Sequence, residues 1–452
     1  MQPNVFFLDL DSFRADRALS SLTSDVNPNL AKIIKKGTLF SKTISAADGT
    51  IISLNATFNS QFPFRTGTRA EKIVLPEENY FSILKQSGYH IYGFVPNTLA
   101  FTKFLNYCEN DNAGYYYTRE RKNLDFEGIL ESLGEKIIEL LKPGKMKEPW
   151  FFFSHTIDLH FPLKVPKDFD SEKFGNSQYD RVLAALDPWF EKFHDSIDES
   201  TTITLLSGDH GALIPYEEKG VRDYEPELKT GLNVGKKIMP KSTHKIGAKM
   251  IVGLRNKIRD SRLKKANEGL TPYQIRSRLP HTMLLLNEEI VNVPLIMTGK
   301  NIPQDKIISN QVRTVDIFPT IFDILGIDDS PKGILDGRSL VPILENKNTD
   351  ELPAYFNTIA HAEITLDDKV GIRTSKYKYF RPTTTKDKEI NLYDLENDPQ
   401  ENVNIADNNP EIVSKMEKIL EDMTQDQDVA GEKLTEEEEK IVEAQLKDLG
   451  YI

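Results

Sequence analysis

Short apolar runs that stop abruptly at polar residues recur along the chain and predict the strands of an α/β fold. These runs cover residues 5–10, 90–95, 150–157, 203–206 and 293–297. Their length and their content of Val, Ile, Leu and Phe are typical of strands buried inside a mostly parallel sheet. Apolar residues at helical spacing predict helices between the runs, for example over 125–141 and 176–198. The alternation therefore predicts a mostly parallel sheet flanked by helices.

The ends of these runs carry the candidate chemistry. Run 203–206 ends in Ser-Gly-Asp-His-Gly, which places the carboxylate of Asp209 beside the imidazole of His210. In open α/β sheets, ligands bind at the carboxyl ends of strands. The pair offers one hard oxygen and one borderline nitrogen, half of a metal site, although a chance pair in a turn is the alternative. Asp11 ends the first run, and Asp9 is expected either to support a ligand or to lie on the surface.

Residues 46–63 contain a further candidate, Thr50. Apolar residues Ile51, Leu54 and Phe58 recur at helical spacing, so a helix is predicted to begin near Thr50. A hydroxyl at that position lies in the positive field of the helix N-terminus, beside free backbone N–H groups. Helix capping alone is the simpler explanation for a threonine there. A second polar cluster, of His155, Asp158 and His160 before Pro162, stands at the end of the run 150–157.

Length and composition predict two domains in a globular protein. The chain has 452 residues, of which 39% are hydrophobic and 28% charged. The predicted division is a catalytic domain over 1–348 and a smaller α+β subdomain with a helical tail over 349–452. No run of 18 apolar residues predicts a transmembrane helix. A single cysteine and an N-terminus without a hydrophobic signal segment lead us to expect a cytoplasmic protein.

The charge is unevenly distributed. A formal net charge of −12 argues against nucleic acid as the main partner. Residues 212–280 nevertheless hold 16 Lys/Arg against 7 Asp/Glu and interrupt the α/β pattern like an insertion. This basic insertion is either a solvated helical surface or a face that docks an anionic substrate or a peripheral anionic surface.

Seven segments of the chain, in their order along the sequence, resemble the sulfatase family of the alkaline phosphatase superfamily. They are Asp11–Asp16, Ser207–Gly211, Val293–Ile296, Val315–Thr320, Arg373–Tyr379, Leu392–Pro399 and Leu449–Ile452. The resemblance covers almost the whole chain. It implies an alkaline-phosphatase-like mixed sheet, and a divalent cation (Ca, Mg, Mn or Zn) held by Asp11, Thr50, Asp209 and His210.

The departure from the family pattern lies at the nucleophile. Sulfatases carry a Cys or Ser that is converted to formylglycine, and the matching position here is Thr50, with Leu54 in place of the signature Arg. Formylglycine is therefore not expected. Superfamily members with an unmodified Thr act on phosphoesters, so the resemblance implies a hydrolase of phosphomono- or phosphodiesters with Thr50 as the metal-activated nucleophile.

The resemblance also assigns catalytic roles to His160 and His281, which would bind the transferred group or protonate the leaving group. A second cation held by Asp158, His160 and His281 is an open alternative. The substrate would be an anionic small-molecule or glycan ester. Alternative functions are a sulfuric ester hydrolase without formylglycine, a transferase that passes a phospho-alcohol group to a glycan, and a silent anion-binding protein.

Overall fold

The computed structural model describes residues 2–68, 72–110, 115–117, 128–215, 221–224, 244–279, 285–347, 349–358, 368–385, 388–425 and 440. The chain divides into two compact units. The larger comprises Met1–Ala212 with Leu284–Ile452, and the smaller comprises Leu213–Met283. The domain boundary placed near residue 348 stays a prediction.

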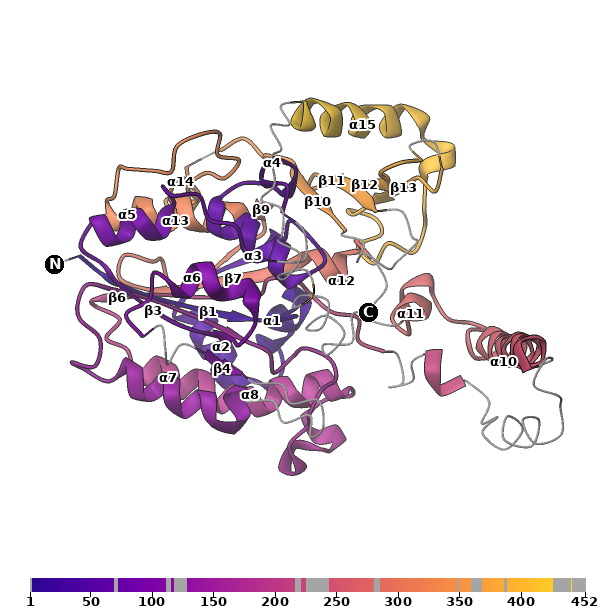
Figure 1. Cartoon of the computed structure of the whole chain (residues 1–452), viewed down its shortest axis with the longest axis horizontal. Helices are drawn as coiled ribbons and strands as arrows, with labels where there is room; N and C mark the ends of the chain where they lie inside the picture. The colour runs from indigo at the N-terminus through magenta and orange to yellow at the C-terminus, as the bar shows by residue number, and fades with distance from the viewer. Residues whose placement is uncertain are drawn as a thin grey trace. The chain divides into compact units, whose positions relative to one another are not determined.

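A mixed, mostly parallel sheet forms the centre of the larger unit (Figure 1). Its strands in the described residues are β1 Asn4–Leu10, β2 Gly37–Ile44, β3 His90–Pro96, β4 Tyr115–Tyr117, β5 Trp150–Thr156, β6 Thr202–Ser207, β7 Asn292–Gly299, β8 Lys306–Ile308 and β9 Val312–Arg313. Their order is β4-β3-β5-β1-β6-β7-β2-β8, and β9 also pairs with β2. Only β7 runs antiparallel to its neighbours within this described sheet. The predicted sheet type is thus confirmed, with β1 central between β5 and β6.

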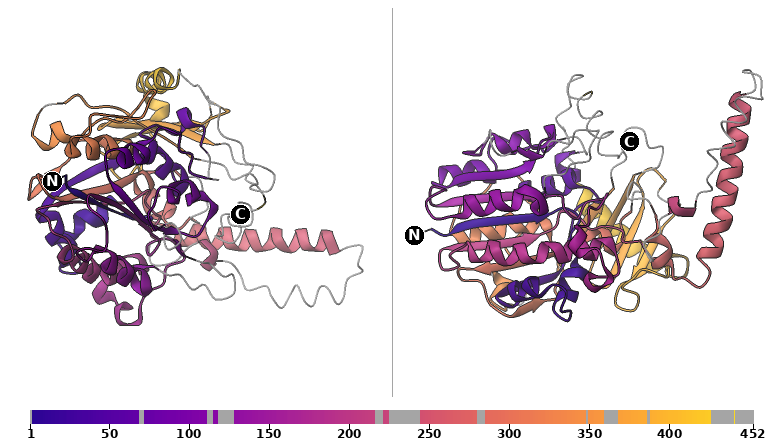
Figure 2. Two further views of the ribbon diagram at one scale, coloured as in Figure 1. Left: turned by 60° about the vertical axis from the view of Figure 1, so that its left-hand side comes forward. Right: turned by 90° about the horizontal axis from the view of Figure 1, so that it is seen from below.

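Helices cover both faces of this sheet (Figures 1 and 2). One face carries α1 Ala15–Ser21, α2 Pro28–Lys35, α7 Gly134–Leu141 and α8 Gln178–Asp195. The other carries α3 Thr50–Asn59, α5 Tyr80–Gln86, α6 Thr102–Leu105 and α13 Ile317–Leu325. This region also contains the short α-helices α4 Pro63–Thr66, α12 Glu288–Val291 and α14 Val341–Leu344.

Alternation along β1 explains the two-sided core. Phe7 meets Phe153 of β5 at 5.2 Å between ring centroids, and Phe153 meets Phe58 of α3 at 5.1 Å. Phe6 points to the opposite face, where its ring lies 6.3 Å from Phe193 of α8. Successive side chains of a strand leave on opposite faces, so an unbroken apolar run indicates a strand covered on both sides.

A four-stranded antiparallel sheet lies in the C-terminal part of the larger unit. Its order is β10 Ala354–Asn357, β11 Lys369–Arg373, β12 Tyr377–Pro382, β13 Asn391–Asp394. Helix α15 Pro410–Thr424 covers it, with Met416 and Leu420 buried. The strands and helix expected for a C-terminal α+β subdomain are therefore confirmed. The main-chain N–H of Asn357 donates to the carbonyl of Ala46 at 3.1 Å and connects this sheet to the loop before α3.

The smaller unit contains α10 His244–Ala266 and α11 Pro272–Arg276. Arg278 is its internal anchor, because the guanidinium donates to the carbonyl of Ala266 at 3.1 Å and to Asn267 Oδ1 at 2.6 Å. This unit corresponds to the basic insertion of the sequence, and a docking role for it stays a prediction. Within the described residues, no helix combines the length and apolarity needed to cross a bilayer.

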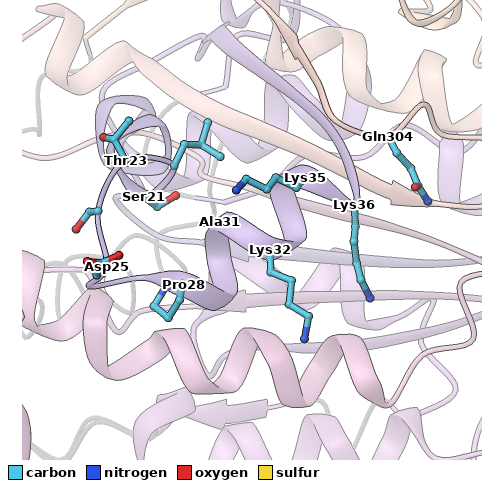
Figure 3. Close-up of a pocket in the computed structure, with 11 residues that line it drawn as sticks. Ser21, Thr23, Asp25, Pro28, Ala31, Lys32, Lys35, Lys36 and Gln304 are labelled. Carbon is cyan, nitrogen blue, oxygen red and sulfur yellow. The ribbon is translucent and has the colours of Figure 1, made fainter.

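A surface hollow of about 600 Å³ lies beside α1 and α2 (Figure 3). Its lining includes Lys32, Lys35 and Lys36. Lys32 is already paired with Glu191 at 2.9 Å. Lys35 and Lys36 directly precede β2 at the amino edge of the sheet, opposite the strand ends that carry Asp11 and Asp209. The hollow is therefore separate from the candidate site.

Candidate metal and active site

The candidate site lies at the carboxyl ends of three adjacent parallel strands. β1 pairs with β5 and with β6, so Asp9 is in register with His155 on one side and with Ser207 on the other. Asp11 follows β1 directly, and Asp209 and His210 follow β6. Parallel pairing brings these ends to one edge of the sheet, as the strand-end rule predicts.

The turn after β1 is held in a shape that aims Asp11 at the second strand end. Ser12 has a left-handed φ of 66°, and its main-chain N–H donates to Asp209 Oδ1 at 3.2 Å. Its hydroxyl donates to Asp11 Oδ1 at 2.8 Å. The hydroxyl of Tyr179 donates to the carbonyl of Ser12 at 2.8 Å and fixes the turn from α8.

Asp11, Asp209 and His210 form a buried cluster with ligand atoms that converge. His210 Nδ1 donates to the carbonyl of Gly211 at 2.8 Å, so the lone pair of Nε2 faces the carboxylates. Nε2 lies 3.6 Å from Asp11 Oδ1 and 3.6 Å from Asp209 Oδ2. Asp209 Oδ2 is buried and has no hydrogen-bond partner among the residues that the structure describes. A buried carboxylate oxygen without a donor indicates a missing partner.

Thr50 completes the cluster from α3. Gly49 is the N-cap of this helix and Thr50 its first residue, so the predicted helix start is confirmed and the capping explanation for Thr50 is wrong. The Thr50 hydroxyl instead lies 3.4 Å from Asp11 Oδ2 and 3.3 Å from His210 Nε2. The structure thus brings together the four side chains predicted from the sequence as one site, while their roles stay predictions.

The spacing of these atoms suits a cation better than direct hydrogen bonding. Ligand pairs in the cluster are separated by 3.3 to 3.6 Å. Two atoms that ligate one small cation at about 2.0–2.1 Å in tetrahedral geometry lie roughly 3.4 Å apart, whereas good hydrogen bonds are shorter. The carboxylates, the imidazole and the orphaned oxygen of Asp209 therefore fit a divalent metal.

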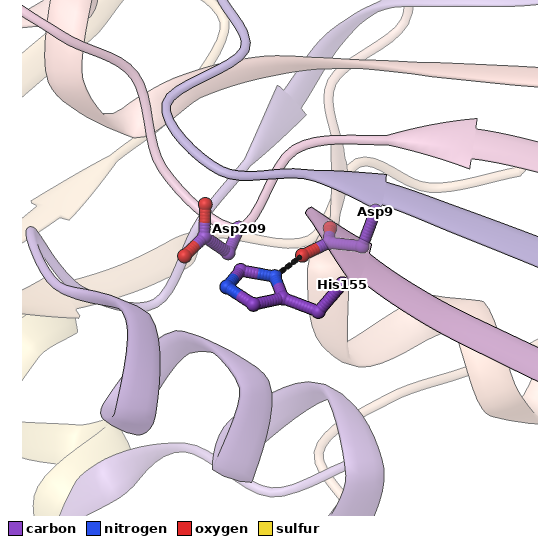
Figure 4. A group of neighbouring side chains, drawn as sticks. All are labelled: Asp9, His155 and Asp209. Carbon is purple, nitrogen blue, oxygen red and sulfur yellow. Dashed lines mark hydrogen bonds and ion pairs between the residues drawn. The ribbon is translucent and has the colours of Figure 1, made fainter. Parts of the chain in front are cut away.

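The structure places at the site a residue to which the sequence assigned no role, His155. Its Nδ1 lies 2.7 Å from Asp9 Oδ2, and its Nε2 lies 3.6 Å from Asp11 Oδ2. The ring lies between Asp9 and Asp209 (Figure 4). Both members of the His155–Asp9 pair are almost fully buried, so the surface alternative for Asp9 is wrong. Among the described residues, Asp9, His155 and Asp209 form a second group able to hold a metal, beside Asp11, Asp209 and His210.

The titration behaviour of the cluster reflects competition between burial and charge. Burial by itself would raise the pKa of Asp11, but attraction to His160 and hydrogen bonding to His155 hold that pKa well below its usual value. Burial would lower the pKa of His210, yet the charges of Asp209 and Asp11 raise it. Protons on the imidazoles thus offset the carboxylates, and a bound cation would replace that positive charge.

The residues of the predicted second cation are arranged differently. Asp158 accepts hydrogen bonds from the backbone N–H groups of Ile129 and Leu130, each at 3.0 Å. Burial raises its pKa to about 6, although those two donors oppose the change. His160 is near enough to Asp11 to affect its titration, and His281 lies outside the described residues. The second cation stays a prediction.

Two models of known protein families match this chain. The family model named Sulfatase matches residues 3–327, which is well over half of the chain. The chain belongs to the sulfatase family. A second model, described as N-sulphoglucosamine sulphohydrolase, C-terminal, matches residues 282–426. The matched regions include β1, the turn after β6 and the C-terminal sheet, so the family resemblance seen in the sequence is confirmed.

Several relatives of this sulfatase-family chain are named proteins. Arylsulfatase K of Mus musculus is 25% identical over 339 residues, which cover 70% of this chain and 55% of that protein. Arylsulfatase K of Homo sapiens is 32% identical over 139 residues, or 29% of this chain and 26% of that protein. The chain therefore spans about half the length of the curated relatives that it matches most extensively.

Solved structures share the fold over nearly the whole chain. The phosphonate monoester hydrolase of Agrobacterium radiobacter matches with a TM-score of 0.63 and 16% identity, covering 96% of this chain and 99% of that one. A 2-O GAG sulfatase matches with a TM-score of 0.63 and 15% identity, covering 94% and 93%. The alkaline-phosphatase-like fold class is thus confirmed.

Proposed function

We propose that this sulfatase-family chain is a metal-dependent ester hydrolase that acts on phosphomono- or phosphodiesters through Thr50. The single observation that carries the proposal is the position of the Thr50 hydroxyl. It stands at the first residue of α3, 3.4 Å from Asp11 Oδ2 and 3.3 Å from His210 Nε2. A hydroxyl placed among converging metal ligands at a helix N-terminus is positioned as a nucleophile.

The residues of the site have distinct tasks in this reaction. Asp11, Asp209 and His210 would hold the divalent cation, which when bound lowers the pKa of the Thr50 hydroxyl and offsets the charge of the ester. Thr50 Oγ1 gives its proton to solvent and attacks phosphorus, an Oγ1–P bond forms, and the bond to the leaving alcohol breaks. His160 gives the leaving oxygen a proton. Water then attacks phosphorus and the Oγ1–P bond breaks; one proton of that water returns to His160, and Thr50 Oγ1 takes up a proton from solvent.

The unmodified threonine favours phosphorus over sulfur as the reacting centre. Threonine has a secondary alcohol and no route to the aldehyde that gives formylglycine, so the ester formed on Thr50 must be cleaved by water. The phosphonate monoester hydrolase with the same fold supports the view that this scaffold accommodates phosphorus esters. A sulfuric ester is the second candidate, because Arylsulfatase K of Mus musculus matches 339 residues of this chain.

The test compares Thr50→Ala and Thr50→Ser on aryl phosphate, aryl phosphodiester and aryl sulfate, each with Mg²⁺, Ca²⁺, Mn²⁺ or Zn²⁺. We expect phosphoester turnover by the wild type, a loss of roughly 10³-fold or more in Thr50→Ala, and partial activity in Thr50→Ser. Acid quenching should trap a phosphorylated Thr50, detected by peptide mass. Thr57→Ala is the matched control on the same helix, since the Thr57 hydroxyl donates to the carbonyl of Ser53.

Each outcome decides between the candidates. Full activity of Thr50→Ala on every ester that the wild type hydrolyses would refute the nucleophile. Turnover of aryl sulfate alone would replace the phosphoester by the sulfuric ester. Transfer of the phospho-alcohol group to an added sugar acceptor, with little free phosphate, would identify a transferase.

A further inference from the structure

A buried histidine behind the four predicted ligands is aimed at them. His155 is the next-to-last residue of β5, and only 1% of it is exposed. Its Nδ1 donates to Asp9 Oδ2 at 2.7 Å. Its other ring nitrogen, Nε2, faces Asp11, whose Oδ2 is 3.6 Å away. His210 Nε2 lies at the same distance from the other oxygen of Asp11.

The ring of His155 is held in this orientation from several sides. Phe101 covers it at 5.6 Å between ring centroids, with an interplanar angle of 31°. Asp9 is its register partner on the neighbouring strand, so the pair is fixed by the sheet itself. The unpartnered Asp209 Oδ2 belongs to the same group of buried ligand atoms (Figure 4). A fixed imidazole that faces Asp11 and shares a buried group of ligand atoms with Asp209 indicates that the three side chains share a ligand.

We propose that His155 is a further ligand of the cation through Nε2, and that Asp9 is the carboxylate that orients it. The inference rests on the cation site of the proposed function and extends it. A histidine that binds a metal through one nitrogen usually donates its other N–H to a carboxylate or a carbonyl. His155 has Asp9 in that role, and His210 has the carbonyl of Gly211.

This ligand set predicts the class of cation. Ca²⁺ and Mg²⁺ are bound almost entirely by oxygen, whereas imidazole suits first-row transition metals and zinc. Two imidazoles, from His155 and His210, join the oxygens of Asp11, Asp209 and Thr50. The site therefore takes a divalent transition cation such as Mn²⁺ or Zn²⁺ in preference to Ca²⁺ or Mg²⁺.

The test measures cation binding rather than turnover. Metal-free protein is titrated with Zn²⁺, Mn²⁺, Mg²⁺ and Ca²⁺ against a chelator, and the bound metal is counted per chain. We expect one cation per chain in the wild type and a preference for Zn²⁺ or Mn²⁺. His155→Gln and Asp9→Asn should each weaken Zn²⁺ binding by roughly 10–100-fold and change Ca²⁺ binding less. His90→Gln is the control, since His90 pairs with Glu109 at 3.2 Å at the opposite edge of the sheet.

A second measurement needs no substitution at the buried pair. Nitrogen NMR of ¹⁵N-histidine-labelled wild type should show two imidazole Nε2 resonances that shift on Zn²⁺ saturation, while the matching Nδ1 atoms keep their protons. An imidazolium at His155 that persists after saturation would overturn the proposal.

Failure of this inference is distinguishable from failure of the proposed function. Cation binding that depends on His155, without turnover of any ester, would refute the hydrolase and leave the ligand assignment standing. Hydrolysis that depends on Thr50, with cation affinity and preference unchanged in His155→Gln and Asp9→Asn, would do the reverse.

Discussion

Removal of the buried ammonium group of Lys378 should destabilise the larger unit strongly. Lys378 of β12 is fully buried, and its Nζ lies 2.9 Å from Glu401 Oε1 and 3.2 Å from Glu288 Oε1. Lys378→Met keeps the length of the side chain and removes the charge. Two buried carboxylates would then face each other with less positive charge between them.

The structure sets the size of the effect. Breaking a buried ion pair by removing one partner costs about 3–5 kcal/mol. Glu288 keeps the guanidinium of Arg373 at 2.8 and 3.0 Å. Glu401 Oε2 keeps donors from Asn287 at 2.7 Å and from the backbone of Glu288 at 3.0 Å. Because these partners remain, we expect the low end of the range, about 3 kcal/mol.

The loss of stability in Lys378→Met should depend on pH, because it depends on the charges of Glu288 and Glu401. Burial raises the pKa of Glu401, although Lys378 opposes this. Burial would also raise the pKa of Glu288, but the charges of Arg373 and Lys378 lower it to about 2. In the wild type, the lowered pKa of Glu288 adds stability above about pH 4.5 that is lost as the pH falls toward 2. In Lys378→Met both carboxylates protonate more readily, so the destabilisation should shrink as the pH falls.

The free energy of unfolding is measured by urea denaturation at about pH 7.5 and about pH 5, with tryptophan fluorescence as the signal. Both tryptophans, Trp150 of β5 and Trp189 of α8, lie in the larger unit. Lys376→Met is the matched control: Lys376 directly precedes β12, is exposed, and should cause no measurable change. A loss under about 1 kcal/mol at neutral pH, or an equal loss at both pH values, would refute the reasoning.

Two further predictions concern the metal loop. Gly211→Ala should reduce cation affinity, because a Cβ there would meet the carbonyl oxygen of Glu289 at 2.1 Å. Gly49→Ala is the control, because a Cβ at residue 49 meets nothing within 4 Å. The rise in melting temperature on cation addition should be smaller in Gly211→Ala than in Gly49→Ala, and equal rises would contradict this account. Cation affinity should fall as the pH decreases from about 8 to about 6, because His210 must lose a proton to bind metal. The charges of Asp209 and Asp11 raise the pKa of His210 and so strengthen this competition. An affinity that does not change with pH in the chelator titration would argue against His210 as a ligand.

Much of the site was predictable because it depends on strand ends. Asp11 and Asp209 each follow an apolar run, and parallel strands bring their ends to one edge whatever lies between them. No role was predicted for His155, because it lies inside such a run, where a histidine resembles a core residue. Its role depends on the register that sets it opposite Asp9, and register is a long-range property.

Asp158 illustrates the opposite limit. Its sequence neighbourhood, a strand end beside His160, indicated a ligand. Its oxygens instead accept from backbone N–H groups of Ile129 and Leu130, residues almost thirty positions earlier. Sequence patterns report local periodicity well, but they do not report which distant helix end a carboxylate will meet.

The packing of α12 limits where this chain can be divided. The carbonyl of Ile290 accepts from the N–H of Gly211 at 2.6 Å, so α12 supports the metal loop from behind. Its first residue, Glu288, is neutralised by Arg373 and Lys378 of the C-terminal sheet. A fragment cut after residue 348 would keep the metal loop and Glu288, but it would lose the side chains of Arg373 and Lys378 that neutralise Glu288. The C-terminal sheet therefore helps to support the site. If the subdomain were exchanged with that of a relative, the new subdomain would need basic side chains that pair with Glu288.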